Sequence, residues 1–332
     1  MIPAERADPT SPERPVALLL GGRGFIGSRL APQLIERGYR IVCVEPIATT
    51  LGRLEPYEAH ITLVNASTAD RDPLIELVAR INPACMFNLA YARGVDIATE
   101  MDIMCRGLWN TFDAARLVGC RRVVFASSVR VYGAQSAHGE ETVLNESSPC
   151  HPLTRYGHAK LLGERLAADF NAAHSMHIAA LRVPMVYGPG VREGAFGVCV
   201  PALAAASGTP TVLPYDPAAR LCLAHVDDVA NALAQLADIR NPAPHHPVYE
   251  LGGNTLSYSG MVAVAKTINP ATRVTFAPTI EQLERQFSCL LDGRRLHAEY
   301  GTHHRPVLDG YREIVDYTRA RATDNETREK AR

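Results

Sequence analysis

The sequence predicts an α/β protein built on a Rossmann-type, doubly wound parallel sheet, with a smaller C-terminal substrate-binding lobe. Three observations predict this class. Short apolar runs alternate with helical patterns through the first half of the chain, and a glycine-rich turn follows the first run directly. Past about residue 190 the alternation loosens and prolines cluster. Such alternation builds βαβ units, whose parallel strands are covered by helices on both faces.

The apolar runs give the expected strands in order. They lie at 15–20, 40–45, 60–65, 84–90, 122–127 and 177–182. Helical patterns between them predict helices near 25–37, 72–81, 99–118 and 155–174. Further helices are expected near 257–268, 280–286 and 307–321, and another opens at 225–230.

These elements define the expected domains. Residues 15–185 form the dinucleotide-binding domain, with 220–252 returning to it, and 186–219 together with 253–322 form the substrate lobe. The charged segments 1–14 and 323–332 lack an apolar stripe and are expected to be tails. Segment 1–14 has no apolar core, so we do not expect a signal peptide.

Composition narrows the function classes. The 332 residues are 47% hydrophobic and 21% charged, and 34 basic against 35 acidic residues give a net charge of −1. This balance provides no net positive potential that would attract nucleic acid or an anionic membrane. No run approaches the ~18 apolar residues of a membrane helix. The eight scattered cysteines indicate reduced thiols in a cytoplasmic protein, and the histidine pairs lack the acidic partners of a metal site.

A phosphate-binding turn follows the first strand. Gly21, Gly24 and Gly27 are spaced G-x-x-G-x-x-G, and a helix begins directly after them. In such a turn the first glycine permits the bend, the second lets the pyrophosphate approach the backbone, and the third lets the helix pack closely on the strand. The helix N-terminus then faces the phosphates. The sequence therefore predicts a nicotinamide dinucleotide as cofactor.

Two residues bear on which dinucleotide is bound. Glu45 ends the second strand, 24 positions after Gly21, and can accept hydrogen bonds from a free ribose 2′-hydroxyl. Arg23, inside the turn, can instead pair with a 2′-phosphate. The balance favours NAD and leaves NADP open.

A catalytic pair follows in the second half of this domain. Tyr156 and Lys160 are four residues apart, on one face of a helix. A nearby ammonium is expected to lower the pKa of the phenol and fit it for proton transfer. Ser127 and Ser128 end the fifth strand at the carboxyl edge of the sheet, where such folds bind ligands, so a serine hydroxyl there can donate to the substrate oxygen.

Taken with these motifs, the sequence resembles the extended short-chain dehydrogenase/reductases, the NAD(P)-dependent epimerase/dehydratase family. The matching segments are GGRGFIG at 21–27, ASSVRVYG at 126–133, YGHAK at 156–160, LRVPMVYGPG at 181–190 and HVDDVANA at 225–232. The resemblance implies that Ser128, Tyr156 and Lys160 are the catalytic set. It adds cofactor contacts at Phe25, Ile26, Ser67, Leu89, Ala90 and Val183 to those of the glycine turn, Glu45, Tyr156 and Lys160. It also implies a homodimer through the helices near 99–118 and 155–174.

The departures from the family pattern concern the substrate. Met185 stands where nucleotide-sugar enzymes usually have asparagine, and Val129-Arg130 replaces the Asp-Glu pair of the sugar dehydratases, which makes dehydration improbable. Arg130 and Arg93 lie where a guanidinium can grip a carboxylate or phosphate. Together with Ser127 and Met185 they are the expected substrate contacts, and we expect an anion other than a UDP or TDP group.

We therefore expect hydride transfer between the nicotinamide and a secondary alcohol or ketone of a small, anionic or sugar-like substrate. Two alternatives remain open: a sugar or nucleotide-sugar epimerase with tightly held NAD, and a non-catalytic subunit or sensor that binds the dinucleotide.

Overall fold

The structure, a computed structural model, describes residues 14–91, 94–191, 197–279 and 287–330. Its centre is a seven-stranded sheet in the order β10-β6-β5-β4-β1-β2-β3, with every neighbouring pair parallel. The strands are β1 Val16–Leu20, β2 Arg40–Glu45, β3 Ile61–Asn65, β4 Cys85–Asn88, β5 Arg122–Ser128, β6 His177–Val183 and β10 Val248–Glu250. The predicted fold class and all six predicted strands are confirmed.

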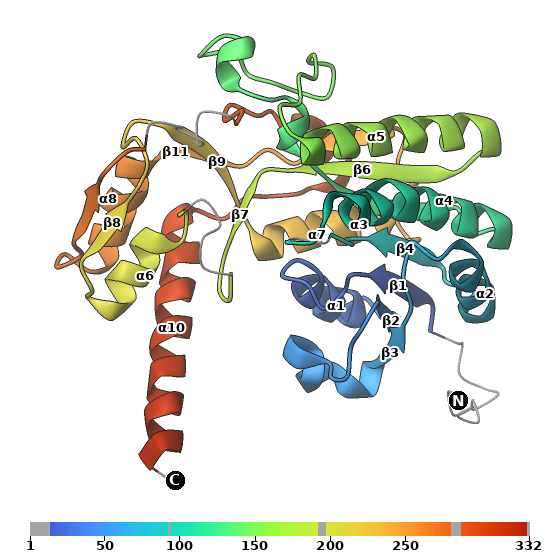
Figure 1. The fold of residues 1–332 in the computed structure, drawn as a ribbon, viewed down its shortest axis with the longest axis horizontal. Coiled ribbons are helices and arrows are strands. Elements are labelled where there is room, and N and C mark those ends of the chain that lie inside the picture. The colour runs from blue at the N-terminus through green and yellow to red at the C-terminus, as the bar shows by residue number, and fades with distance from the viewer. Residues whose placement is uncertain (1–13, 92–93, 192–196, 280–286, 331–332) are drawn as a thin grey trace.

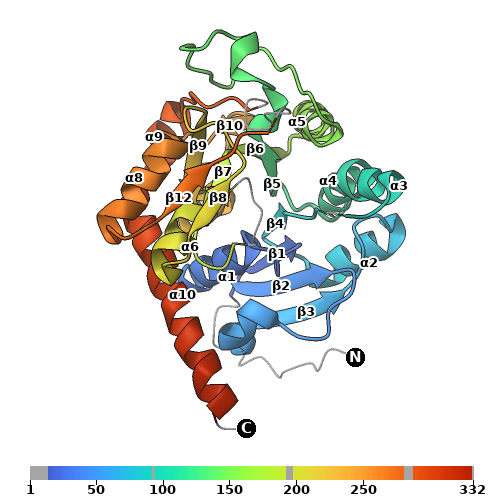
Figure 2. The same ribbon diagram turned by 60° about the vertical axis from the view of Figure 1, so that its left-hand side comes forward.

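Helices cover both faces of this sheet (Figures 1 and 2). One face carries α1 Gly27–Glu36 and α7 Val226–Ala237, and the other carries α2 Arg71–Ile81, α4 Gly107–Val118 and α5 Arg155–His174. Alternate residues of β1 enter the two separate cores. Ala17 and Leu19 pack with α1 and α7, whereas Leu18 and Leu20 pack with α2, α4 and α5. A strand buried on both faces therefore reads as one continuous apolar run.

The helix predicted at 99–118 is divided into three parts. They are α3 Ile97–Met101, a π-helical turn Asp102–Arg106, and α4. Gly107 follows the π-turn, and a Cβ there would come within 2.4 Å of the Thr68 hydroxyl oxygen. The absence of a side chain at Gly107 lets this helix approach the segment after β3 closely.

The smaller lobe contains two further sheets and its own core. One sheet has the order β11-β9-β7, from Asn254–Ser257, Arg220–His225 and Met185–Tyr187, and the other pairs β12 Val274–Phe276 with β8 Thr211–Leu213. Its helices are α6 Val200–Ser207, α8 Tyr258–Ile268 and α10 Val307–Lys330, with α9 Arg294–Tyr300 nearby. The helix predicted to end near 321 thus continues to Lys330, and the one predicted at 280–286 falls outside the described residues.

A 3-10 segment, Gly52–His60, joins β2 to β3. All eight cysteines are free thiols. Among the described residues, we find no helix with the length and apolar character needed to cross a membrane.

Candidate active site

The glycine turn connects β1 to α1 as the sequence predicts. Gly21 has a φ of +83°, and a Cβ there would come within 3.0 Å of the backbone of Leu89 and Ala90. A Cβ on Gly27, the first residue of α1, would come within 2.5 Å of the Gly22 carbonyl oxygen. The turn and the helix start are therefore packed backbone against backbone, which larger residues would prevent.

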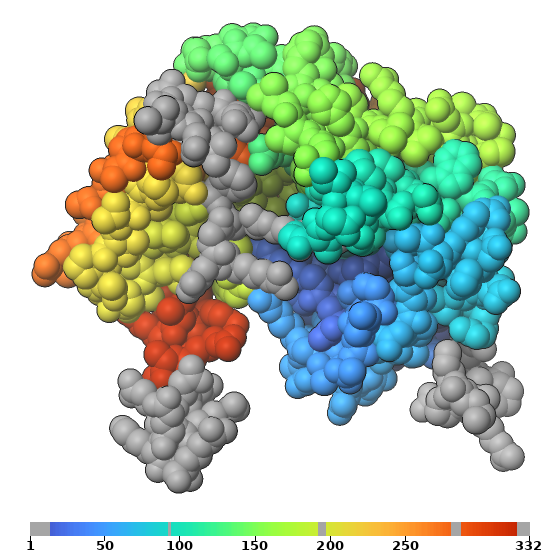
Figure 3. Space-filling view, in the orientation of Figure 1, coloured from blue at the N-terminus to red at the C-terminus, as the bar shows by residue number. Residues whose placement is uncertain are grey.

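A cavity of about 390 Å³ lies against this turn. Seven of the predicted cofactor residues line it: Gly21, Arg23, Gly24, Glu45, Ser67, Leu89 and Ala90. Thr68, Tyr91 and Ile103 complete its wall together with Val44, Pro46 and Ala66. The space-filling view shows a hollow between the blue segment that follows β2 and the teal α3 (Figure 3).

This cavity has the surroundings that the phosphates of a dinucleotide need. Gly21, Arg23 and Gly24 of the glycine turn line it, and the turn leads directly into the N-terminus of α1, the positive end of the helix dipole. A Cβ on Gly24 would meet only the Gly21 carbonyl oxygen, at 3.2 Å, so this position faces open space. Six further residues predicted as cofactor contacts do not line the cavity: Phe25, Ile26, Gly27, Tyr156, Lys160 and Val183.

Glu45 and Arg23 lie at the same end of the cavity. The Glu45 carboxylate accepts a hydrogen bond of 2.7 Å from the backbone N–H of Arg23, which fixes it beside the turn. The Arg23 guanidinium extends toward the segment after β2, 3.5 Å from the Thr50 hydroxyl. The carboxylate thus occupies the position from which it can accept hydrogen bonds from a ribose, as the preference for NAD requires.

The three predicted catalytic residues meet at the carboxyl edge of the sheet. Ser128 is the last residue of β5, and its side chain hydrogen-bonds Tyr156 in the first turn of α5. Lys160 lies one turn further on, with its ammonium nitrogen 5.4 Å from the centre of the Tyr156 ring. Thr154 caps this helix by accepting a hydrogen bond from the Gly157 N–H, which fixes its start.

The electrostatics differ from the sequence expectation. Burial raises the pKa of Tyr156 to about 12, although the Ser128 hydrogen bond and the charge of Arg130 act to lower it. Burial also lowers the pKa of Lys160 to about 8. The prediction that the phenol pKa is lowered is therefore wrong. Desolvation of the phenolate raises this pKa by more than the Ser128 hydrogen bond and the charge of Arg130 lower it. The phenol is protonated at neutral pH and can donate a proton.

Two further groups surround Tyr156. The ring of Tyr91 stands edge-on to it, with centroids 5.2 Å apart, and Tyr91 also lines the cofactor cavity. The Arg130 guanidinium lies over the ring of Phe287, 4.0 Å from its centroid. Sequence reasoning missed Tyr91. It could have been found, because it is a large aromatic residue shortly after β4, at the edge of the sheet where such folds bind ligands.

Ser127 does not face this site. Its hydroxyl is buried and donates a 2.6 Å hydrogen bond to Glu164, which also forms an ion pair with Arg182 at 2.7 Å. Successive residues of a strand point to opposite faces, so Ser127 and Ser128 cannot both reach the substrate. The predicted substrate contact at Ser127 is therefore corrected to a structural hydrogen bond beneath α5.

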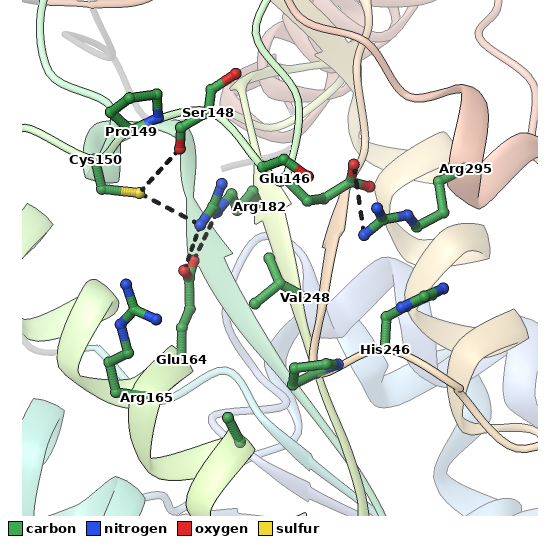
Figure 4. Close-up of a pocket in the computed structure, with 13 residues that line it drawn as sticks. Glu146, Ser148, Pro149, Cys150, Glu164, Arg165, Arg182, His246, Val248 and Arg295 are labelled. Carbon is green, nitrogen blue, oxygen red and sulfur yellow. Dashed lines mark hydrogen bonds and ion pairs between the residues drawn. The ribbon is translucent and has the colours of Figure 1, made fainter.

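The Glu164–Arg182 pair borders a second cavity of about 410 Å³ (Figure 4). Figure 4 shows the two side chains directed at one another, with Cys150 beside them and Arg165 nearby. None of the predicted catalytic residues lines this cavity. We assign the pair a structural role, holding α5 on β6.

Val183, predicted as a cofactor contact, lies on β6 and pairs in register with Ser128. Met185, predicted as a substrate contact, begins β7 two residues later and is partly exposed. Arg93 lies outside the described residues.

One cluster has the composition of a metal site. Single ligand atoms of His225, Asp227 and Glu313 lie within 4.8 Å of one another. Arg29, however, grips Asp227 through two hydrogen bonds of 2.5 and 2.8 Å, and Arg305 pairs with Glu313. Two guanidinium groups already neutralise these carboxylates and would repel a cation, so we do not assign a metal here.

Comparison with known families matches residues 17–252 to the NAD dependent epimerase/dehydratase family. The chain belongs to this family. The resemblance inferred from the motifs, an NAD cofactor and enzymatic chemistry of the extended short-chain dehydrogenase/reductase class are thereby confirmed.

Individual relatives are more distant. The chain is 27% identical over 233 residues to the UDP-N-acetyl-alpha-D-glucosaminuronate decarboxylase of Bacillus cytotoxicus, covering 67% of this chain and 70% of the relative. It is 29% identical over 184 residues to the D-erythronate dehydrogenase of Cupriavidus necator, covering 51% and 54%. The UDP-glucose 4-epimerase of Thermus thermophilus, solved with NAD, has the same fold, with a TM-score of 0.77 at 21% identity over 92% and 99% of the two chains.

Proposed function

We propose that this protein is an NAD-dependent oxidoreductase acting at a secondary alcohol or ketone of a small, anionic or sugar-like substrate. The observation that carries the proposal is the meeting of Ser128, Tyr156 and Lys160 next to Tyr91, which lines the dinucleotide cavity. A relative named as a dehydrogenase of a small hydroxy acid, D-erythronate, supports this reaction type.

The chain's own residues have distinct roles in this proposal. Gly21, Gly24 and Glu45 would hold NAD, which supplies or accepts the hydride. In the reducing direction Ser128 donates a hydrogen bond to the carbonyl oxygen, and Tyr156 delivers the proton. Lys160 places a positive charge behind the phenol ring, which opposes the cost of forming the phenolate.

An epimerase is the second candidate, and the description of the family favours it. An epimerase returns the hydride to the same substrate and forms no net NADH. It is therefore distinguished by tightly bound NAD after purification together with the absence of net absorbance change at about 340 nm.

The test is Tyr156→Phe, which removes one hydroxyl and keeps the ring packed against Tyr91. We expect turnover to fall by about 10²- to 10⁴-fold, because no group remains to exchange the proton. NADH binding, followed by fluorescence, should remain within about twofold of wild type. Unchanged turnover would exclude the proposed chemistry. Equal loss of NADH binding would mean that the substitution had damaged the cavity rather than the catalysis.

A homodimer through α4 and α5 is part of the proposal. Ile97, Trp109, Leu117 and Leu162, on α3, α4 and α5, are each between 44% and 56% exposed. Large apolar side chains of this exposure on neighbouring helices are typical of association surfaces. A monomeric mass by light scattering at micromolar concentration would argue against it. We also propose a cytoplasmic location, in keeping with eight free thiols.

A further inference from the structure

Glu164 connects the helix that carries Tyr156 and Lys160 to two neighbouring strands of the sheet. Its carboxylate accepts a 2.6 Å hydrogen bond from the Ser127 hydroxyl of β5, and hydrogen bonds of 2.9 and 2.7 Å from the Arg182 guanidinium of β6. Ser127 and Arg182 are direct register partners on these two strands. All three residues are buried, each 2% to 3% exposed. One carboxylate therefore joins α5, β5 and β6 at a single point.

This junction lies on the same stripe of α5 as the reacting groups. Tyr156, Lys160 and Glu164 are spaced four residues apart, so each lies about one turn beyond the one before. At about 1.5 Å per residue, Glu164 lies about 12 Å along the helix from Tyr156. Ser128, which follows Ser127 in β5, hydrogen-bonds Tyr156. Two consecutive residues of one strand thus hold the same helix at two separate points, which constrains both its position along the strand and its rotation.

Close packing transmits any shift of this helix to its catalytic first turn. A Cβ on Gly157 would come within 2.6 Å of the Arg130 carbonyl oxygen. A Cβ on Gly163, next to Glu164, would come within 2.5 Å of the Leu108 side chain of α4 and 3.1 Å of the Phe125 ring of β5. The backbone of α5 therefore lies directly against its neighbours, and a densely packed interior passes a displacement on rather than absorbing it.

We propose that Glu164, with Ser127 as its hydrogen-bond donor from β5, is a positioning residue that places Tyr156 and Lys160 against Ser128 for proton transfer. The inference rests on the proposed function and adds to it a residue that acts through the helix, without contact to the reacting atoms. Placement matters because a displacement of about 1 Å can lower a rate by about 10²-fold.

The test removes one hydrogen bond at the junction. Ser127→Ala leaves the buried Glu164–Arg182 ion pair in place, so this variant should fold with only a modest loss of thermal stability. The full-length protein is labelled with fluorotyrosine, and the fluorine resonance of Tyr156 is assigned by its loss in Tyr156→Phe. This resonance reports the surroundings of the phenol ring and needs no substrate. We expect it to shift by more than its linewidth in Ser127→Ala.

Turnover gives the second measurement, with NAD and D-erythronate as the probe. If the wild-type protein turns this probe over, Ser127→Ala should lower kcat about tenfold or more, because the phenol is displaced from Ser128. KM for the probe and the affinity for NADH should stay within about twofold of wild type, because no ligand contact is removed. Ser127→Thr keeps the hydroxyl, and it should recover most of kcat and the wild-type resonance.

Asn171→Ala is the matched control, because Asn171 also holds α5 on the sheet, but near the other end of the helix. Its side chain forms hydrogen bonds of 2.9 and 2.8 Å with the backbone of Ile178 in β6. This variant loses two hydrogen bonds and should lose at least as much thermal stability as Ser127→Ala. It should nevertheless leave the Tyr156 resonance and kcat as in wild type.

The proposal is overturned if the Tyr156 resonance does not move in Ser127→Ala, or if it moves and kcat for a probe that is turned over stays unchanged. An equal shift in Asn171→Ala would show a general effect of lost stability, and an equal loss in Ser127→Thr would show an effect of packing; either result also overturns it. Failure of the proposed function is seen separately, as turnover that Tyr156→Phe does not lower, whereas the resonance reports the placement of the ring whatever the reaction.

Discussion

At the scale of single residues, the protonation states of Tyr156 and Lys160 bear on the direction in which the proposed reaction would run best. Burial holds the pKa of the phenol at about 12 and that of the ammonium at about 8. A buried phenol at neutral pH is an acid, so it is ready to protonate a carbonyl oxygen. To act as a base it must first lose its proton against the cost of burial.

This gives a pH prediction. Alcohol oxidation needs the phenolate, whose fraction rises about tenfold per pH unit below the pKa, so kcat/KM for oxidation should rise from about pH 6 to about pH 9. Ketone reduction needs the protonated phenol and should show no such rise. Steady-state rates in both directions over this range test it. A plateau in the oxidation profile that begins below about pH 8 would show that another group acts as the base.

Which residues could be predicted follows from the kind of constraint on each. Gly21, Glu45, Tyr156 and Lys160 are set by local spacing within one turn or helix, and the sequence places them. Tyr91 reaches the site only because β4 lies beside β1 in the sheet, which no local pattern reveals. Ser127 and Ser128 are neighbours that point to opposite faces of β5, and the sequence alone does not show which of the two faces the site.

At the scale of elements, the β1 turn and α1 separate packing from binding. Gly27 is in contact with the backbone of Gly22, whereas Gly24 faces the cavity. The two glycines belong to one motif, yet their surroundings differ: Gly27 is packed against backbone, and we propose that Gly24 contacts the cofactor.

Alanine at each position should separate these roles. Gly27→Ala forces a Cβ against backbone and should lower the free energy of unfolding by about 2 kcal/mol or more. Gly24→Ala meets only one oxygen, at 3.2 Å, and should leave stability nearly unchanged. It should weaken NADH binding by about tenfold, which is about 1.4 kcal/mol. Thermal unfolding and NADH titration of both variants test this. Equal losses of stability would contradict the assignment.

The helix predicted at 99–118 shows the limit of periodicity at this scale. The apolar pattern places a helix there, but the π-helical turn at Asp102–Arg106 ends at Gly107, which lies against Thr68, 39 positions earlier in the sequence. Ile103 of that turn lines the cofactor cavity. π-helical turns are frequent next to ligand sites. The apolar pattern does not reveal this one, because a π-turn barely changes the spacing of the apolar residues.

At the scale of the whole molecule, the chain leaves the sheet after β6, builds part of the small lobe, and returns with α7 and then with β10 at the edge of the sheet before it completes the lobe. The pattern predicted a return over 220–252, but the three-residue strand β10 is too short to be recognised as a strand. The division of the chain into domains remains a prediction.

The returning strand carries a buried carboxyl group, Glu250, fully enclosed at the end of β10. Burial raises its pKa to about 8, although the Gly252 N–H and the charge of Arg182 act to lower it. The folded protein therefore holds a proton that the unfolded chain releases near its ordinary pKa of 4.5. The stability that this proton provides is complete below about pH 4.5 and is lost as the pH rises through about 8.

Glu250→Gln should remove this dependence, because the amide has the same shape and no charge to bury. At pH values above about 8 the variant should be more stable than wild type, by a free energy of unfolding on the order of 5 kcal/mol, whereas below about pH 5 the two should be similar. Thermal unfolding at both pH values measures this, and Glu76→Gln, on the exposed side of α2, is the control for loss of one acidic charge. If Glu250→Gln is destabilised equally at both pH values, the carboxylate is ionised in the folded state and is needed as the partner of Arg182. In that case an ion pair, rather than a buried neutral acid, holds β10 at the edge of the sheet.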